Sequence, residues 1–479
     1  MAGEIRRVVI LGGGVAGWMS ALALGKALHG SGVTIDLVET QGPDHSVGPF
    51  GPAEAVLPAF HRFLDDHAID EDALLGAARG TFALGAAFSG WAGQQSAWFL
   101  PFGDTGAPMG SVAFPPLVAR LRSAGYPVRP TDFSLAAVAA AAGRFARPSD
   151  DPRSVQSSYG YGLHLDKAGF AEVCRALAVG VTHHNAPFRH AVRAENGQVA
   201  ALELEGGAQI AGDLFLDCSG PQALLCEGHG FDSWSAWLAC DRVVERGNVQ
   251  EGIPPPYTHA GAHAAGWLRS VPLTGGPGEA MLFASAHHAE DGALPIHQGR
   301  RTRAWHGNVV AIGAAAATIE PLYGHNLQLV ANAIRRLIGL FPNRAEGVEA
   351  AEYNRITADE ADRVRDFLIA HYKTNGRTGE PFWDAARAMP VPDALQYKLD
   401  LYASRGRMPM YDEELFTRAE WIAMLDGQGV HPRRYDALAE TVPEAAIIQH
   451  MTRLRDLIVD SAKAMPNHGT TLAQIGAKA

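Results

Sequence analysis

The pattern of apolar and polar positions predicts alternating strands and helices over the first part of the chain. Residues 7–11 form a short apolar run, and residues 33–38 form a second one of similar length, as expected for two buried strands. Alanine-rich stretches at residues 20–28, 134–142 and 170–179 predict helices. This mixture predicts an α/β fold.

The middle of the chain carries further strand signals. Residues 198–204 and 209–217 resemble a hairpin with a Gly-Gly turn at 206–207. The end of the second segment, 213–217, reads as a buried strand that runs into a polar turn. Residues 252–278 are rich in Gly, Pro and Ala, and we predict an irregular segment there, a candidate wall of an active site.

Beyond residue 342 the strand signals stop and helical periodicity takes over, as at residues 349–372 and 447–464. We therefore expect two lobes. The predicted division is an α/β lobe at 1–341, with inserted segments at about 80–155 and 225–300, and a helical lobe at 342–479.

A glycine-rich turn follows the first predicted strand and gives the first functional signal. Gly12, Gly14 and Gly17 form the pattern G-x-G-x-x-G, and the acidic Glu39 ends the second predicted strand. In such a motif the first glycine allows a tight turn, the second lets the backbone approach a pyrophosphate, and the third packs helix on strand. The acid accepts a hydrogen bond from a ribose hydroxyl. The pattern predicts a bound dinucleotide; the alternative is a glycine turn without a ligand.

Composition narrows the class of protein. The chain has 479 residues, 47% of them apolar, which is enough for a sizeable core. Its net charge of −11, with no basic block, argues against nucleic acid and anionic membranes as partners. We find no signal peptide and no apolar run of membrane-spanning length, and the four cysteines lack metal-site spacing. We expect a cytoplasmic protein with buried, reduced thiols.

Several further motifs occur in an order that resembles one family, the flavin-dependent tryptophan halogenases. Residues 12–18 are similar to the family's GGGxAGW, residues 53–58 to its GEATIP, and residues 80–85 to its GTFKLG. The remaining landmarks lie at 101–103, 164–166, 217–220, 308–313, 320–322, 381–383 and 465–468. The resemblance extends over nearly the whole chain.

The resemblance implies a fold and a chemistry. It implies an FAD-binding, Rossmann-like α/β lobe with a β-sheet and a helical C-terminal lobe that supports an aromatic substrate. In that family a separate flavin reductase delivers reduced FAD, oxygen generates the oxidant, and chloride or bromide becomes hypohalous acid. A lysine paired with a glutamate then holds or activates the oxidant beside the substrate. The expected partners are a small aromatic substrate and the reductase, and a homodimer is one possible assembly.

Together the motif and the resemblance assign residues to FAD. No metal site is predicted at the adjacent histidine pairs 183–184 and 287–288. The predicted FAD-binding residues are Gly12, Gly14, Val15, Ala16, Gly17, Glu39, Thr40, Ala53, Glu54, Ala55, Gly313, Ala314, Asn326 and Leu327.

The chain departs from the family pattern at the oxidant-handling residues. Ala83 occupies the position of the family lysine, and Tyr323 occupies that of the glutamate. A methyl group can neither donate a hydrogen bond nor form a haloamine. Because both partners of the pair are replaced, we interpret the site as remodelled. Arg269 replaces the second tryptophan of the family's WxWxIP motif, and Lys167, the lysine beside a motif, is predicted at the surface.

Tyr323 and His325 are the candidate catalytic residues. They flank Gly324 in a loop expected to face the flavin or the tunnel, and both can handle protons. The competing interpretation makes Tyr323 a space-filling ring and turns the His325 side chain away. Arg269 is either an anion-binding residue or a partner in a salt bridge. Among the aromatic residues of the helical lobe, core packing is the default role for Trp383, Trp421 and Tyr435, although one or two could line a pocket.

These observations lead to three hypotheses. The first is an FAD-dependent oxidoreductase that uses reduced FAD and O2 on an aromatic or indole-like substrate without the lysine relay. The second is a halogenase that works through free hypohalous acid. The third is a flavin-binding protein without turnover. The FAD motifs fit all three hypotheses and cannot distinguish between them.

Overall fold

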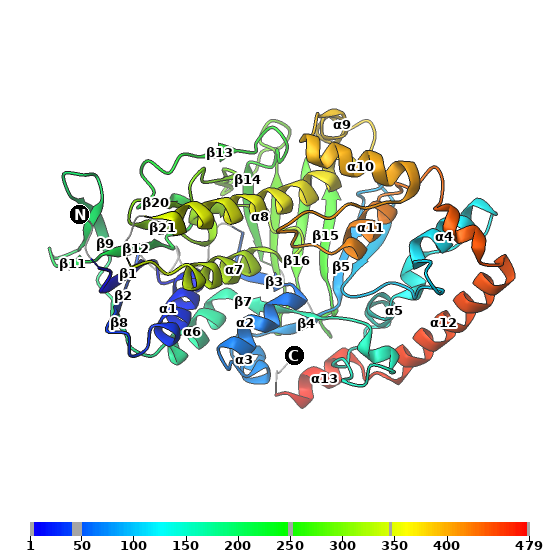
Figure 1. Cartoon of the computed structure of the whole chain (residues 1–479), viewed down its shortest axis with the longest axis horizontal. Helices are drawn as coiled ribbons and strands as arrows, with labels where there is room; N and C mark the ends of the chain where they lie inside the picture. Colours follow the sequence, from blue (N-terminus) through cyan, green and yellow to red (C-terminus); the bar gives the residue numbers. More distant parts are fainter. Residues whose placement is uncertain (1–3, 41–49, 248–251, 344–346, 477–479) are drawn as a thin grey trace. The chain divides into compact units, whose positions relative to one another are not determined.

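The structure is a computed structural model that describes every residue except 1–3, 41–49, 248–251, 344–346 and 477–479 (Figure 1). The chain divides into two compact units, each assembled from three separate stretches of sequence. The first unit contains residues 1–80, 165–247 and 290–363, and the second contains residues 81–164, 248–289 and 364–479.

A mostly parallel sheet forms the centre of the first unit. Strand β1 (Arg7–Leu11) lies between β12 (Leu214–Asp217) and β2 (Thr34–Val38), and pairs with both in parallel. From Val8 onward its side chains are completely buried, which explains the uninterrupted apolar run in the sequence. The sheet continues on one side through β8 (Val181–His184) and on the other through β21 (Val309–Ala311) to the antiparallel edge strand β20 (Trp305–His306).

Helices pack beside this sheet. Helix α1 (Val15–Ala27) follows β1 directly and contacts both α6 (Lys167–Leu177) and α7 (Asn326–Gly339), as Figure 1 shows. The small residues of α1 allow the close approach, and every residue from Gly17 to Gly25 is buried. Two shorter helices, α2 (His61–Asp66) and α3 (Glu71–Ala77), complete the helical part of this unit up to the start of α8.

The predicted hairpin is only partly correct. Strand β10 (Val199–Leu204) pairs antiparallel with β9 (Phe188–Arg193) and with β11 (Gln209–Ala211). The predicted second strand breaks after β11, because the carboxylate of Asp213 accepts hydrogen bonds from the backbone N–H groups of Arg6 and Arg7. The following residues therefore join the central sheet as β12. The short strands of this unit are β3 (Ala53–Val56), β13 (Asp232–Ser233), β14 (Arg242–Gly247), β18 (Leu294–Pro295), β19 (Gly299–Arg300) and β22 (Ala317–Thr318).

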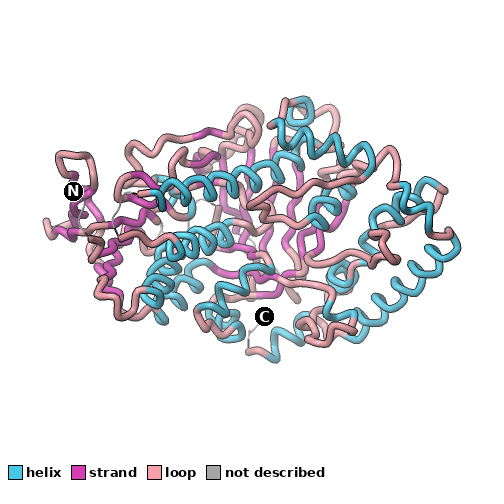
Figure 2. Tube along the Cα trace, in the orientation of Figure 1, coloured by secondary structure: helices cyan, strands magenta, loops and turns pink. Residues whose placement is uncertain are grey.

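The second unit has its own antiparallel-rich sheet, drawn in magenta in Figure 2. Five of its strands run in the order β17-β16-β15-β5-β6. The prediction that residues 252–278 are irregular is wrong, because β15 and β16 lie within them. The high content of Gly, Pro and Ala in these residues hides the pattern of a strand. The hydrogen bonds of β15 come from its pairing with β5, which is distant in the sequence. The strands are β5 (Gly85–Ser89), β6 (Ala97–Pro101), β15 (Thr258–His263), β16 (Gly266–Val271) and β17 (Gly278–Phe283).

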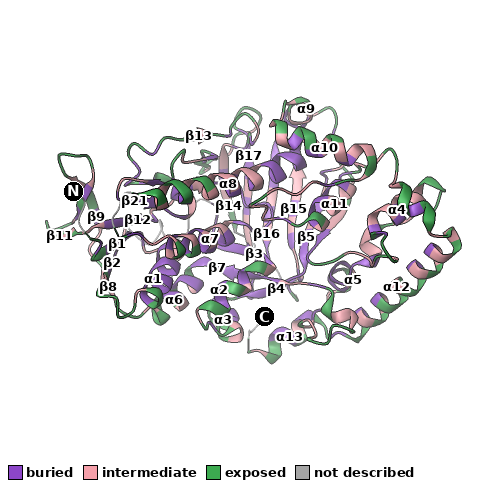
Figure 3. Cartoon of the chain, in the orientation of Figure 1, coloured by how far each residue is buried: buried purple, intermediate pink, exposed green. Residues whose placement is uncertain are grey.

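Helices dominate the C-terminal part, as predicted. Helix α8 (Val348–Lys373) begins in the first unit and ends in the second, and α12 (Glu444–Ala464) alternates buried and exposed positions (Figure 3). No strand is assigned beyond Thr318 in the part of the chain that the structure describes, and none of the described helices is long and apolar enough to cross a membrane. The other helices are α4 (Phe114–Ser123), α5 (Leu135–Ala141), α9 (Pro381–Ala388), α10 (Asp393–Arg405), α11 (Arg418–Gly427) and α13 (His468–Gln474).

Candidate functional site

The glycine turn closes tightly between β1 and α1. The backbone N–H of Gly12 donates to the carbonyl oxygen of Val38, 2.8 Å away, and Gly12 has φ of +117°. A Cβ atom on Gly12 would lie 2.5 Å from the carbonyl oxygen of Cys218, and one on Gly17 would lie 1.8 Å from the carbonyl oxygen of Gly12. Both positions therefore require glycine, for the reasons that the motif predicts.

A cavity of about 1080 Å³ opens at this turn. Its walls come from the turn, from the polar segment after β12, from β3, and from the segment that leads into α7. Four of the predicted FAD-binding residues do not line this cavity. Gly17 packs α1 against the glycine turn, and the other three, Glu39, Ala53 and Ala55, lie in or next to neighbouring strands. The predicted FAD-binding residues that line the cavity are Gly12, Gly14, Val15, Ala16, Thr40, Glu54, Gly313, Ala314, Asn326 and Leu327.

Glu39 is fixed at the carboxyl end of β2. Its Oε1 accepts a hydrogen bond from Nε2 of His183, 2.9 Å away, which assigns a proton to that ring nitrogen. The carboxylate also lies against Gly13, where a Cβ atom would be only 1.9 Å from Oε2. The next residue, Thr40, lines the cavity. The acid predicted to bind ribose is therefore held in place by a histidine from β8.

Asp217 shapes a second wall of the cavity. Its carboxylate is completely buried and accepts hydrogen bonds from the backbone N–H groups of Ser219 and Leu225, at 3.0 and 2.7 Å. These bonds hold the turn after β12, so that Cys218 and Ser219 face the cavity. Burial raises the pKa of the Cys218 thiol to about 12, which keeps it protonated and unreactive.

The residues around this cavity suit FAD. Small side chains and glycines leave the backbone accessible at the start of α1, where helix amides attract a pyrophosphate. The N-cap residue Gly14 places no side chain over those amides. Apolar side chains such as Ile319 and Val330 line another part of the cavity, as a planar ring system requires.

The two candidate catalytic residues lie in the loop that precedes α7. Tyr323 is 2% exposed and His325 is completely buried. Gly324 between them has φ of +72°, and a Cβ atom there would lie 3.0 Å from the carbonyl oxygen of Ala55, so the loop packs against β3. His325 is also the N-cap residue of α7, whose first residue, Asn326, lines the cavity. A catalytic role for Tyr323 and His325 stays a prediction.

Ala83 lies in β4 (Thr81–Ala83) of the second unit, where it is 1% exposed. It is the register partner of Gly162 in β7 (Gly162–Asp166). Beside it, the hydroxyl of Thr81 donates to the carbonyl oxygen of Pro272 at 2.8 Å, and therefore accepts from Nδ1 of His164 at 2.8 Å. Burial holds the pKa of His164 well below its usual range, so the ring stays neutral.

His468 fixes the same strand from α13. Its Nδ1 donates to the carbonyl oxygen of Pro254 at 2.7 Å, so its Nε2 is the acceptor for the backbone N–H of Phe82 at 3.4 Å. Burial lowers the pKa of His468 to about 4, which keeps this acceptor available at neutral pH. Two neutral histidines thus hold the strand that carries Ala83.

The prediction that Lys167 is a surface residue is wrong. The side chain is buried, with 6% exposed, and it lines the FAD-type cavity. The first turn of α6 is joined to the residue before β3, because the backbone N–H of Lys167 donates to the carbonyl oxygen of Pro52 at 2.8 Å. The N–H of the preceding Asp166 donates to Ala78 at 2.9 Å. No sequence signal indicates this burial, since it depends on segments more than 80 residues away.

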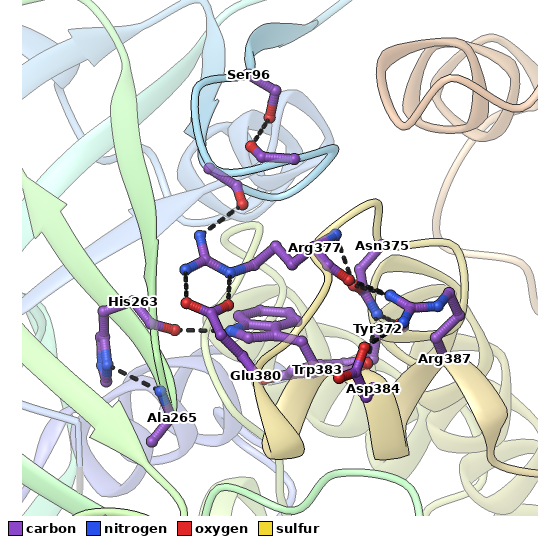
Figure 4. Close-up of polar contacts among 12 residues, drawn as sticks. Ser96, His263, Ala265, Tyr372, Asn375, Arg377, Glu380, Trp383, Asp384 and Arg387 are labelled. Carbon is purple, nitrogen blue, oxygen red and sulfur yellow. Dashed lines mark hydrogen bonds and ion pairs between the residues drawn. The ribbon is translucent and has the colours of Figure 1, made fainter.

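The aromatic candidates of the second unit divide into two groups. Trp383 and Trp421 are completely buried, which confirms core packing for both. Figure 4 shows Nε1 of Trp383 donating to the carbonyl oxygen of His263, at 2.7 Å, beside the Arg377–Glu380 ion pair. Tyr435 instead lines a separate cavity of this unit.

The remaining polar candidates are a buried arginine and a histidine that is hydrogen-bonded to an aspartate. Arg269 is 1% exposed in β16. His184 forms a hydrogen bond through Nε2 with Oδ1 of Asp36, at 2.7 Å. Among the described residues, no group of three or more His, Cys, Asp or Glu side chains is placed to hold a metal ion.

A parallel sheet whose first strand ends in this glycine turn and cavity defines a dinucleotide-binding protein of the Rossmann type. Comparison with known proteins gives the family. The tryptophan halogenase family model matches residues 7–444, and the chain belongs to that family. It is an FAD-dependent oxidoreductase of this family, and the resemblance stated from the motifs and the α/β fold are both confirmed.

Relatives match over most of their length. The flavin-dependent halogenase BrvH from Brevundimonas sp. BAL3 is 35% identical with a TM-score of 0.93, covering 98% of this chain and 99% of that one. Xcc4156, a flavin-dependent halogenase from Xanthomonas campestris, is 32% identical with a TM-score of 0.92, covering 98% of each. The tryptophan 7-halogenase RebH of Lentzea aerocolonigenes is 29% identical over 450 residues, 84% of this chain and 82% of its own.

Proposed function

We propose that this enzyme uses reduced FAD and O2 to oxidise a small aromatic or indole-like molecule without a lysine relay. The observation that carries this proposal is the buried methyl group of Ala83 at the position of the family lysine. Tyr323, at the position of the family glutamate, is buried as well. Neither side chain can form the ion pair on which the relay depends.

The lysines of the second unit support this interpretation. Each of the three described there is bound away from β4: Lys373 donates to the carbonyl oxygens of Arg387 and Met389. Lys398 pairs with Glu414, and Lys463 pairs with Asp460. The fourth, Lys478, is outside the described residues. Within that part of the unit no other lysine takes the place of the missing one.

A cleft in the second unit suits an aromatic substrate. It is open to solvent and is lined by the half-buried rings of Trp98, Phe99 and Tyr257. Phe99 and Tyr257 meet edge to face with 5.8 Å between their centroids. Ala87, the register partner of Phe99, lies four residues beyond Ala83 and also lines the cleft. Flat apolar walls of this kind recognise aromatic rings.

The chain's own residues would perform three tasks. The start of α1 would hold the dinucleotide, with Glu39 fixed beside the cavity at the end of β2, and the buried Tyr323 would exclude water from the adjoining loop. His325 and the Tyr323 hydroxyl are the groups that move or hold a proton there. Reduced FAD, when bound, supplies the electrons for the activation of O2. Because the sequence has one dinucleotide fingerprint, we assign flavin reduction to a separate reductase, and we place the reaction in the cytoplasm.

The test uses the purified protein with a flavin reductase, NADH, O2, and a panel of indoles and phenols, with and without bromide. We expect oxygenated products that do not depend on bromide. Efficient bromination would overturn the proposal in favour of free hypohalous acid, and Ala83→Lys would then raise the yield. Tight FAD binding without substrate-stimulated oxygen consumption would identify a flavin-binding protein without turnover.

A further inference from the structure

A further cavity of the second unit has no part in the proposed function. This α4–α11 cavity opens between α4, the end of α10, α11 and the loop at 431–435, and extends over about 990 Å³, partly open to solvent. Arg122 and Asp426 line both this cavity and the cleft that contains Trp98 and Phe99. The cavity and the cleft are therefore neighbours that share a wall.

Two helices each present one face to the α4–α11 cavity. The lining residues are spaced at i, i+3, i+4 and i+7 on both helices, which places them on one face of each. They are Pro115, Val118, Ala119 and Arg122 on α4, and Ala419, Ile422, Ala423 and Asp426 on α11. Rings complete the wall, those of Phe114, Pro116, Pro432 and Tyr435. Small and flat apolar walls of this kind suit an aromatic ligand.

The hydroxyl of Tyr402 is a buried donor without an acceptor. Tyr402 lines the cavity and is 3% exposed, and its hydroxyl has no hydrogen-bond partner among the described residues. Burial raises the pKa of Tyr402, the Asp426 carboxylate raises it further, and the Arg122 guanidinium opposes this change. Because both of these residues line the cavity, the phenol oxygen on which they act lies toward it. The hydroxyl is protonated at neutral pH, so it can donate one hydrogen bond to a ligand.

The charges around the cavity favour an anion. Two guanidinium nitrogens of Arg122 donate to the two carboxylate oxygens of Asp426, and Nδ1 of His431 lies 3.2 Å from Oδ1 of the same carboxylate. Arg405 also lines the cavity, and its guanidinium has no ion-pair or hydrogen-bond partner in the part of the chain that the structure describes. It follows Tyr402 by three positions on α10, so the two side chains lie on the same face of that helix. A neutral donor and an uncompensated positive charge thus stand together.

We infer that the α4–α11 cavity binds a small molecule in which an aromatic ring carries a carboxylate. The ring lies against the faces of α4 and α11, and the carboxylate accepts hydrogen bonds from the Tyr402 hydroxyl and the Arg405 guanidinium. A guanidinium matches a carboxylate in charge and geometry, whereas it repels an amine. This site is distinct from the FAD cavity and goes beyond the proposed function, since binding here needs neither cofactor nor turnover.

The experiment is isothermal titration calorimetry of the full-length protein with cinnamate, without FAD or a reductase. We expect cinnamate to bind at least about fivefold more tightly than the uncharged cinnamamide or the cationic cinnamylamine. Tyr402→Phe and Arg405→Gln should each weaken cinnamate binding about fivefold, because each removes a hydrogen bond to the carboxylate. Arg405→Gln should leave the affinity for cinnamamide unchanged.

Each variant has a matched control in the same unit. Tyr397→Phe removes an exposed hydroxyl from α10, and Arg418→Gln removes an exposed guanidinium from the start of α11. Neither residue lines the cavity, so both variants should bind cinnamate like the wild type. Ala419→Phe fills the cavity and should abolish binding. Phe99→Ala alters the cleft alone and should leave the affinity unchanged.

Several outcomes would overturn the inference. They are an absence of cinnamate binding at millimolar concentration, equal affinities for cinnamate and cinnamamide, and tighter binding of cinnamylamine. Binding that is lost in Phe99→Ala but kept in Tyr402→Phe and Arg405→Gln would place cinnamate in the cleft and overturn it as well. If Ala419→Phe or Tyr402→Phe is poorly folded, Arg405→Gln decides alone, because Arg405 is exposed. Failure of the proposed function would leave all these results unchanged, since neither FAD nor O2 chemistry enters them.

Discussion

Gly12 packs its Cα atom against the carbonyl group of Cys218, so that any side chain there would begin 2.5 Å from the oxygen of that carbonyl. This contact joins the glycine turn to the end of β12, and both residues line the cavity described above. Backbone atoms on both sides leave little room for adjustment.

We predict that Gly12→Ala reduces FAD binding at least tenfold and destabilises the first unit. A positive φ of +117° is unfavourable for alanine, and such strain costs about 1–3 kcal/mol before the clash is counted. FAD titration and thermal unfolding measure the two effects. Gly76→Ala is the matched control, because nothing lies within 4 Å of that position in α3 and alanine favours a helix. Equal behaviour of the two variants would contradict the assigned role of Gly12.

We predict that Thr81→Val destabilises the second unit by about 2–4 kcal/mol. The substitution keeps the shape but leaves the Nδ1–H of His164 and the carbonyl oxygen of Pro272 buried without this partner, and each such group costs about 1–3 kcal/mol. Chemical denaturation followed by near-UV circular dichroism measures the change. Thr182→Val, at an exposed position of β8, should stay within about 0.5 kcal/mol of the wild type. A similar result for Thr81→Val would show that the network does not stabilise the fold.

We predict that acid destabilises α8 through His371. Its Nδ1 donates to the carbonyl oxygen of Phe367 at 2.9 Å, and the rings of Phe88 and Trp91 surround it. Burial lowers the pKa of His371 to about 4. As pH falls through about 6.5 the unfolded chain takes up a proton that the folded chain refuses until about pH 4, so stability is lost on acidification.

The variant His371→Phe isolates this contribution. Between pH 7 and pH 5 the wild type should lose about 2 kcal/mol more stability than the variant, because the phenylalanine ring has no nitrogen to protonate. Urea midpoints at the two pH values measure the difference. Parallel losses in the two proteins would assign the acid sensitivity to other groups.

We predict strong coupling between Lys398 and Glu414. Their side chains are 3% and 4% exposed and form an ion pair, while Nε1 of Trp421 donates to the same carboxylate at 3.1 Å. Removing one partner leaves a buried charge, so Lys398→Met should cost about 3–5 kcal/mol. The double variant Lys398→Met with Glu414→Gln should cost less than the sum of the single variants, by about 1–3 kcal/mol in a double-mutant cycle. Additive losses would argue against the pair.

The local elements were predictable because their signals are local. The apolar run at β1 and the Gly12 turn predict the first strand, its helix and a dinucleotide cofactor, since glycine spacing and strand length depend on neighbouring residues alone. Helix α12 was predictable for the same reason, because its helical spacing of apolar residues repeats within its own 21 residues. The departures predicted at Ala83 and Tyr323 also rest on the sequence alone, because they are changes of side-chain chemistry at positions assigned by the resemblance of motifs.

Only the tertiary structure determined what depends on distant partners. Strand β15 is hidden by its glycine and alanine content and becomes a strand through pairing with β5, some 170 residues away. The strand predicted at residues 209–217 ends early, because the carboxylate of Asp213 accepts a hydrogen bond from the backbone N–H of Arg6, just before β1. Lys167 reads as a surface residue until the first turn of α6 meets Pro52 and the side chain joins the cavity. The sequence thus determines the cofactor-binding framework, whereas burial and charge inside the cavity follow from long-range contacts that no local pattern encodes.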